Sequence, residues 1–536
     1  MKKIFSILFI LLLSFSLSAP LAASNCESCD DSCTIDCSVT CTSADTVGDC
    51  GFFCQGHFAP RSQASDTARR LVGRNLYLYR YEENGYYGTF SITPEVTRSF
   101  RTEELGRYLS PIADCNCFTV GQEALADIRG EDFGLNCTGT GNQVCLNPRV
   151  TNFLVEFSLF LGLDECWKGL FVDIHLPVVH TWWDTNCCLD ASTTCSATFP
   201  SCLMSTNQTN TAVGTTNVVQ ALNGDFVWGD VNAEMCFGKL CCRPTKTGVA
   251  DLQVNIGYNF WTCEDYHVAA KLVVKAPTGN KPNARFLFEP IVGNGGHWEL
   301  GGGLTAHYIL WNQDDNCNLA FHLDSEVTHL FGTGCETRLF DLCANGCYSR
   351  YLLLKKFSNN GTTLDGLERG PNVFAQNLST SISVQGDVTA LLSYKSECWL
   401  FDLGYNFWGR SQEQCDSTCF DIPEKTYGIK GIQPMCNGAS ANLTTASQST
   451  IQESIGTDGQ GDAPNIPIFV SNKDLNVYSA LAPSAISNAF VFHAGYLWES
   501  SDYTPYLGLG GKIEFSGDCN TTLDQWALWL KGGLTF

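Results

Sequence analysis

The chain has 536 residues, 29 of them cysteine, and a formal net charge of −23 at pH 7. This charge excludes nucleic acid as a partner, because phosphates would be repelled by so acidic a surface. Charged residues make up only 16% and aromatic residues 12%, whereas soluble domains carry about 25% charged residues. The composition therefore favours one large closed sheet over two or three soluble domains.

Residues 1–23 predict a secretory signal peptide. Lys2 and Lys3 precede the apolar run IFSILFILLLSFSLSA, and small residues follow at Ala19, Ala22 and Ala23. After this run the sequence has no apolar stretch of about 18 residues, so no transmembrane helix is expected. We expect export through the general secretory route.

Residues 24–71 form a cysteine-rich segment, with seven cysteines between positions 26 and 54. Exported proteins form disulfides, so we expect disulfides within this segment or crosslinks to other chains. The Cys26–Cys29 spacing also suits zinc, but the four-residue steps that follow fit no zinc-finger pattern. SQASDTARRLVG (62–73) is typical of a short helix capped by Ser62 or Ser65. One interpretation is that this segment plugs a barrel, and the other is that it supplies one more strand.

Alternating apolar and polar side chains dominate the chain from residue 72 onward. In DLQVNIGYNFW (251–261) every second residue is apolar and the residues between are mostly polar or glycine. A period of two predicts β-strands. About fifteen such strands are readable, near 72–82, 88–101, 151–163, 167–183, 251–261, 264–276, 297–311, 317–331, 336–342, 348–356, 385–395, 399–408, 486–499, 506–515 and 526–536.

The two faces of these strands favour a membrane barrel over a soluble sandwich. The polar faces are rich in Gly, Asn, Gln, Ser and Thr, with isolated charges. Strands of about 10–12 residues tilted by about 40° cross the roughly 25 Å apolar band of an outer membrane. The sheet must close, because unpaired backbone groups in hydrocarbon cost several kcal/mol each. Residues 72–536 therefore predict an all-β, transmembrane antiparallel β-barrel of about 14–16 strands with long, disulfide-rich outer loops.

The connections between the predicted strands differ in length on the two sides of the barrel. On one side they are short: 83–87, 163–166, 262–265, 312–316, 343–347, 395–398 and 499–503. The other side receives 102–150, 184–248, 277–296, 332–335, 357–384, 410–485 and 517–522. Short periplasmic turns and long outer loops are typical of bacterial outer-membrane barrels.

The final stretch WALWLKGGLTF (526–536) is an amphipathic strand with Phe536 as its last residue. It resembles the C-terminal signal read by the barrel assembly machinery, with its glycine shifted by about one position. With the signal peptide and the cysteine load, the chain resembles Gram-negative porin-like outer-membrane barrels, including the cysteine-rich major outer-membrane proteins of chlamydia-like intracellular bacteria. The resemblance implies the bacterial outer membrane as location, with outer-membrane lipid and the assembly machinery as partners.

Charged and polar side chains on the inferred inward faces are the candidate pore-lining residues. They are Glu156, Asp173, His175, Asp251, Lys271, Glu299, His322, Asp324, Glu326, Asp402, Lys512 and Glu514. A mostly acidic lining around a hydrated pore would favour cations. The alternative is that these charges neutralise one another inside a filled lumen. No catalytic or metal-ligating motif surrounds them, so we predict no enzyme activity, no metal and no cofactor.

Loop cysteines predict that the outer loops are held together by disulfides, each contributing about 2–4 kcal/mol. The disulfide candidates are Cys26, Cys29, Cys33, Cys37, Cys41, Cys115, Cys117, Cys187, Cys188, Cys241, Cys242, Cys415 and Cys419. A compatible interpretation is that some of them crosslink neighbouring barrels, since the cysteine count is odd.

Two hypotheses follow for function, and a third concerns the fold. The first is a porin-like channel for passive diffusion of small hydrophilic solutes, as a single barrel or a homo-oligomer. The second is a structural or adhesive surface barrel, crosslinked into the envelope and without an open channel. The third is a secreted, cysteine-rich soluble β protein.

Overall fold

The computed structural model describes residues 54–75, 78–79, 86–122, 125–190, 194–199, 212–231, 233–314, 317–431, 469–498, 503–517 and 522–536. These residues belong to one compact unit, Thr34–Phe536. The predicted signal peptide and the candidates Cys26, Cys29, Cys33, Cys37 and Cys41 lie outside the described residues. Among the described helices, none combines the length and the apolar character needed to span a membrane.

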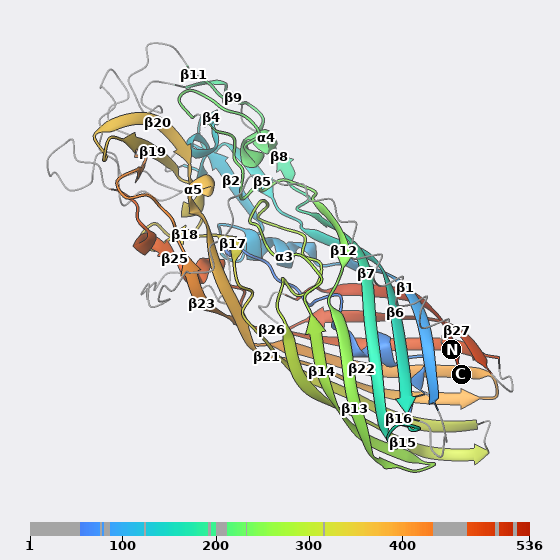
Figure 1. The fold of residues 1–536 in the computed structure, drawn as a ribbon. Coiled ribbons are helices and arrows are strands. Elements are labelled where there is room, and N and C mark those ends of the chain that lie inside the picture. Colours follow the sequence, from blue (N-terminus) through green and yellow to red (C-terminus); the bar gives the residue numbers. More distant parts are fainter. Residues whose placement is uncertain are drawn as a thin grey trace. The chain divides into compact units, whose positions relative to one another are not determined.

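Twelve antiparallel strands form a closed ring, drawn as the tilted barrel in Figure 1. In ring order they are β1 (Tyr86–Ser99), β6 (Arg149–Leu163), β7 (Leu170–Asp184), β13 (Leu252–Thr262), β14 (Tyr266–Ala276), β15 (Glu299–Asp314), β16 (Cys317–Leu330), β21 (Ala375–Ser396), β22 (Trp399–Arg410), β26 (Ala485–Leu497), β27 (Thr504–Ser516) and β28 (Gln525–Thr535). The last strand closes the ring by pairing with the first, and the backbone of Phe536 bonds to Gly88.

The strands turn their apolar side chains outward, as the alternation predicts. On β22, Phe401 and Leu403 are 46% and 65% exposed, whereas Asp402 between them is 4% exposed. On β28, Leu528 and Leu530 are exposed and Trp529 between them is buried. An apolar outer belt on a closed ring leaves no unpaired backbone edge within the lipid. The prediction of an all-β transmembrane barrel is therefore confirmed.

The number of strands in the ring is twelve, not the predicted 14–16. The whole sheet does contain 15 strands, because β12 (Thr245–Val249), β17 (Glu336–Leu339) and β23 (Glu413–Cys419) extend it beyond the ring. All twelve ring strands match predicted strands. The predicted strand at 72–82 is wrong in its described residues, which form a turn directly after a helix that ends at Leu71, followed by a bend at 78–79. The range predicted at 336–342 contains two short strands, Glu336–Leu339 and Asp341–Leu342, whereas that at 348–356 is a strand only from Leu353 onward; all of them lie outside the ring.

The asymmetry of the connections is confirmed. The short connections are 164–169, 263–265, 315–316, 397–398 and 498–503, and together they define what we call the short-turn rim. The other rim receives 100–148, 185–251, 277–298, 331–374, 411–484 and 517–524. The predicted short turn at 343–347 is wrong, because it belongs to the long connection between β16 and β21.

The long connections fold into a cap with small sheets of its own. These comprise β2 (Cys117–Gly121), β3 (Ile128–Arg129), β5 (Asn142–Cys145) and β8 (Cys188–Asp190); β4 (Asn136–Cys137) with β9 (Cys195–Ser196); β10 (Thr198–Phe199) with β11 (Ala212–Val213); β18 (Asp341–Leu342) with β25 (Leu475–Asn476); and β19 (Leu353–Ser358) with β20 (Thr363–Arg369) and β24 (Tyr427–Ile429). The helices are α3 (Thr102–Leu109), α4 (Val218–Asn223), α5 (Gly370–Phe374), η2 (Gly130–Phe133), η4 (Ser349–Tyr351), η5 (Asn472–Asp474) and η6 (Val477–Ala480). They surround one apolar core that includes Phe58, Trp183, Phe288 and Tyr351.

Four disulfides link described cysteines, and all of them lie in the cap. They are Cys54–Cys347, Cys117–Cys145, Cys137–Cys195 and Cys187–Cys241. Two of these bonds follow from strand pairing, since their cysteines face each other across β2–β5 and β4–β9.

Three candidate cysteines form no disulfide in the part of the chain that the structure describes, which corrects the prediction for them. Cys188 lies opposite Cys145 in the β5–β8 pair, but Cys145 is already bonded to Cys117. Cys115 is likewise left without a partner, because its neighbour Cys117 occupies the facing position. Cys242 is unpaired beside the bonded Cys241. The candidates Cys415 and Cys419 lie on β23.

Candidate functional site: the barrel lumen

Residues 54–75, which we call the luminal segment, run through the interior of the ring. Their helix α2 (Thr67–Leu71) lies inside the barrel in Figure 1 and contacts β16, β21 and β22. The helix is within the predicted range 62–73, but its N-cap is Asp66, whose carboxylate accepts from the Arg69 backbone N–H. Ser62 and Ser65, the predicted caps, bond instead to Asp251 and Lys275 of the wall.

Four arginines of the luminal segment make ion pairs with carboxylates of the wall. Arg61 lies 2.9 Å from Asp387 and 3.0 Å from Glu514. Arg69 bridges two strands, 2.8 Å from Glu156 and 3.3 Å from Glu95. All of these side chains are at most 4% exposed. Buried pairs of this kind are costly to break, because removing one partner leaves an uncompensated charge.

The other two arginines extend these contacts around the ring. Arg70 pairs with Glu326 on β16, and Arg74 lies 3.2 Å from Asp173 on β7. Asp173 in turn bonds to His175 at 2.7 Å. Each arginine therefore holds the segment to a different part of the wall.

Lysines and carboxylates of the wall also bind the segment. Lys512 lies 2.6 Å from Asp66, and Lys531 donates to the Arg69 carbonyl at 2.7 Å. Asp402 accepts from the Gly73 backbone N–H at 2.9 Å. Polar contacts of the segment thus reach β1, β6, β7, β14, β16, β21, β22, β27 and β28.

All twelve predicted pore-lining residues lie on the inner wall, at the positions the alternation gives them. Several pair with each other as well as with the segment: Lys271 lies 2.6 Å from Asp324, and Lys275, just beyond the predicted set, lies 3.0 Å from Glu299. His322 is buried, and its Nε2 has no hydrogen-bond partner among the described residues. Their role in lining an open pore stays a prediction.

The wall is acidic and the segment is basic. Among the described residues the wall carries ten inward carboxylates: Glu95, Glu156, Asp173, Asp251, Glu299, Asp324, Glu326, Asp387, Asp402 and Glu514. Its inward lysines are four: Lys271, Lys275, Lys512 and Lys531. The segment opposes this excess of negative charge with four arginines and one aspartate. The arginines therefore compensate charges that a wall without the segment would expose to the lumen.

Little free volume remains between segment and wall. A void beside Arg61, Arg69, Glu95 and Lys512 measures about 30 Å³, which is room for about two water molecules. Toward the short-turn rim the lumen is filled by rings, since Tyr79 stacks on His267 with centroids 4.1 Å apart. The segment and these rings therefore occupy much of the lumen that the structure describes.

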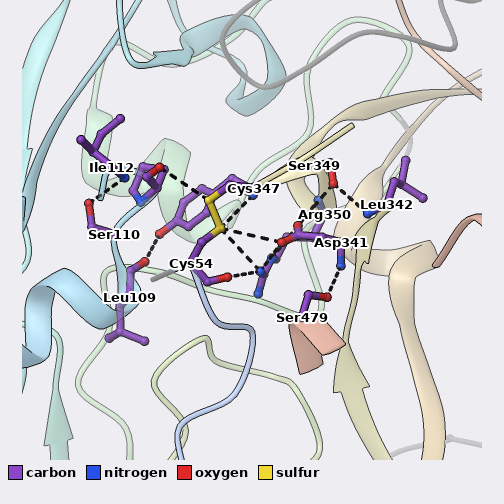
Figure 2. Close-up of a disulfide and its surroundings, with 12 residues drawn as sticks. Cys54, Leu109, Ser110, Ile112, Asp341, Leu342, Cys347, Ser349, Arg350 and Ser479 are labelled. Atoms are coloured by element: carbon purple, nitrogen blue, oxygen red, sulfur yellow. Dashed lines mark hydrogen bonds and ion pairs between the residues drawn. A yellow bond between two sulfur atoms is a disulfide. The ribbon is translucent and has the colours of Figure 1, made fainter. Parts of the chain in front are cut away.

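The segment is also fixed to the cap at its outer end. Cys54 is disulfide-bonded to Cys347, and Phe58 is buried in the cap core against Trp183 with ring centroids 5.7 Å apart. Figure 2 shows that Arg350 approaches this disulfide, donating to the Cys54 carbonyl at 2.6 Å and pairing with Asp341. The tether and the ion pairs together hold the segment in the lumen.

The similarity of this chain to known proteins is partial and distant. A family model described as "Putative MetA-pathway of phenol degradation" matches residues 197–375, less than half of the chain. No curated protein matches the sequence.

Three solved structures show the range of similarity. An outer membrane channel from Pseudomonas putida F1 has a TM-score of 0.35 at 10% identity, covering 86% of this chain and 98% of that one. The toluene transporter TodX of Pseudomonas putida has a TM-score of 0.29 at 8% identity, covering 90% and 95%. The toluene transporter TbuX of Ralstonia pickettii has a TM-score of 0.24 at 7% identity, covering 84% and 89%.

The arginines of the luminal segment are the functional residues that the sequence predictions did not include. The sequence does contain a signal for these arginines. Arg61, Arg69, Arg70 and Arg74 fall within 14 positions, and the predicted inner wall is rich in carboxylates. Such a cluster is attractive to an acidic cavity. The sequence predicts a short helix at 62–73 and a possible plug, but it assigns these arginines no partner in the wall.

Proposed function

We propose that the chain is an outer-membrane channel for small hydrophilic solutes, gated by its luminal segment. The observation that carries the proposal is the pairing of residues 61–75 of the segment, which are basic and make no covalent bond to the wall, with an acidic inner wall. When the segment leaves its seat, the wall exposes a ring of carboxylates that would attract cations and admit water. The predicted resemblance to cysteine-rich outer-membrane proteins of chlamydia-like bacteria is part of this proposal, supported by the disulfide-bonded cap.

The second candidate is a structural or display barrel that never opens. A specific observation favours it: Cys54–Cys347 and the burial of Phe58 fix the segment to the cap. Under this alternative the ion pairs only stabilise a filled barrel. The two candidates differ in one measurable property, which is conductance.

Single-channel recording of the full chain in planar lipid bilayers tests the proposal. With a tenfold KCl gradient we expect openings whose reversal potential has the sign of a cation-selective pore. Liposome uptake of small sugars, compared with toluene, then tests the preference for hydrophilic solutes. The absence of openings in the native protein and in variants with a weakened segment would support the display barrel instead. An anion-selective reversal potential would contradict the role of the acidic wall.

A further inference from the structure

The outward faces of the twelve ring strands carry almost no charge, as a surface in contact with lipid requires. Nearly all described Asp, Glu, Lys and Arg side chains of these strands alternate inward, toward the lumen. The exceptions are Arg98 on β1, Arg149 on β6 and Asp184 on β7. These three strands are consecutive in the ring and lie side by side in Figure 1. The outward charges of the described ring are therefore gathered at one place.

The register of the strands places these charges at the outer end of the apolar belt. Four outward residues form one row across β28, β1, β6 and β7, namely Trp526, Arg98, Thr151 and Trp182. Tryptophan favours the membrane–water interface, so the row marks this interface on the side of the cap. Arg149 lies two residues beyond Thr151 on the cap side. It is therefore a diagonal neighbour of Arg98, at a separation of about 7–8 Å.

The acidic side chains around this row have cationic partners of their own. Asp184 lies 3.5 Å from Arg243, and Asp524 lies 3.6 Å from Arg101. Both of these arginines belong to connections on the cap side. The two carboxylates are therefore compensated without the outward arginines of the strands.

Arg98 and Arg149, which we call the outward arginine pair, have no such compensation. Within the described residues neither guanidinium makes an ion pair, and the Nε of Arg149 has no hydrogen-bond partner. The next acidic groups along the chain from β1 are Glu103 and Glu104, which are exposed in the first turn of α3, beyond the end of the strand. The pair thus presents two cationic groups at the height of the lipid headgroups.

The outward arginine pair fits an anionic lipid better than a second barrel. A second copy of the chain would have to offer outward carboxylates, and on the described ring strands it has only Asp184, which is already paired with Arg243. The outer leaflet of a Gram-negative outer membrane, by contrast, consists largely of a phosphorylated glycolipid. The long connections of such barrels face the outside, so the cap and the pair lie on the side of that leaflet.

We propose that the outward arginine pair binds a phosphate group of this outer-leaflet glycolipid. A guanidinium binds phosphate through two parallel hydrogen bonds. Arg98 can reach the headgroup by laying its aliphatic stem along the apolar belt. Val96 and Phe153 are exposed opposite each other on the membrane side of the row, and they provide a surface for the acyl chains of the same lipid. The pair would thereby hold a lipid molecule at the β1–β6 side of the barrel.

Lipid titrations of the full chain in detergent, followed by native mass spectrometry, test the proposal. Three probes are compared: diphosphorylated lipid A, the same lipid without its phosphates, and inorganic phosphate. We expect lipid A to bind at least about tenfold more tightly than its dephosphorylated form, and inorganic phosphate not to replace it. R98Q/R149Q should lower the affinity for lipid A to that of the dephosphorylated lipid. R98K/R149K should retain part of the affinity, since lysine keeps the charge but not the paired hydrogen bonds.

The control R285Q/K425Q removes two exposed cationic side chains of the cap and should bind lipid A as the native chain does. Heat-modifiable migration on a gel verifies that each variant folds. Arg98→Gln alone, with an expected loss of at least about threefold, replaces a double variant that does not fold. The binding is measured without conductance, so a barrel that never opens leaves the proposal standing. Undiminished binding by R98Q/R149Q, equal binding of the two lipids, or equally tight binding of inorganic phosphate would each overturn it, as would the loss of a dimer in place of the loss of lipid.

Discussion

Replacement of Arg69 by methionine is the sharpest test of a gated lumen. Its guanidinium bridges Glu156 at 2.8 Å and Glu95 at 3.3 Å, and it also donates to the Gln63 carbonyl at 2.7 Å. Arg69→Met keeps an unbranched chain of similar length while removing every one of these donors. Two buried carboxylates on neighbouring strands then lose the guanidinium that bridges them.

The substitution should destabilise the seated state, in which the segment is bound to the wall of the lumen. Removing one partner of a buried pair costs about 3–5 kcal/mol, and every 1.4 kcal/mol changes a population tenfold. If the displaced state exposes Glu95 and Glu156 to water, most of this cost is absent there. The ratio of displaced to seated molecules should therefore rise by about two to three and a half powers of ten.

Single-channel open probability measures this ratio directly. We expect Arg69→Met to open far more often than the native chain, and the double variant R69M/E156Q to recover part of the native behaviour. The control Arg243→Met breaks an exposed cap pair with Asp184, which is worth about 0–1 kcal/mol, and should leave opening unchanged. An Arg69→Met barrel that loses heat stability but never opens would refute the reasoning, because the seated segment would then be a permanent part of the fold.

Three further predictions concern the lipid face, the tether and the cap. Leu403→Lys puts a charge on a lipid-facing residue that is 65% exposed, and should cost about 2–4 kcal/mol in urea unfolding from lipid vesicles, with Leu403→Phe as the near-neutral control. Cys54→Ser removes the tether to Cys347 and should raise the open probability in the same recordings, as should reduction of the native chain, whereas reductant should not affect the variant. Burial raises the pKa of Glu289, in the β14–β15 connection, to about 7. This effect outweighs the hydrogen bonds that its carboxylate accepts from the backbone N–H groups of Asn283 and Ala284, which lower the pKa. The folded connection then keeps a proton that the unfolded chain has released above about pH 4.5. The free energy of local opening of this connection, measured by hydrogen exchange of its backbone amides, should fall by up to about 3 kcal/mol as pH rises from about 4.5 to 7. Glu289→Gln should remove this dependence on pH.

The ring strands were predictable because lipid imposes a strict rule on them. A strand such as β22 must put Phe401 and Leu403 on one side and Asp402 on the other, and that rule is visible in the sequence. The rule does not distinguish a lipid-facing strand from one that packs on an apolar core. For this reason β19, whose Leu354 is buried in the cap core, was counted with the barrel.

The content of the lumen was less predictable than its wall. The inward position of Glu156 or Glu514 follows from the period of two alone. Whether such a residue meets water or an arginine depends on where a separate, irregular segment lies, and no periodicity encodes that placement. Two signals pointed to it: the short helix predicted at 62–73, which suits a plug, and the charge opposition between Arg61–Arg74 and the wall.

The two kinds of contact made by the luminal segment indicate which part of it can move. Residues 61–75 are held chiefly by ion pairs and hydrogen bonds, whose groups regain hydration when water enters the lumen, and to a smaller extent by the burial of Ala68, Leu71 and Val72 in an apolar cluster. The outer end differs, because Cys54 is covalently bound and Phe58 is buried among rings of the cap. Displacing Phe58 would expose apolar surface at about 25 cal/mol per Å² without any compensating hydration. The expected motion is therefore a rearrangement of residues 61–75 about a fixed outer end, with the segment retained in the barrel as the channel opens.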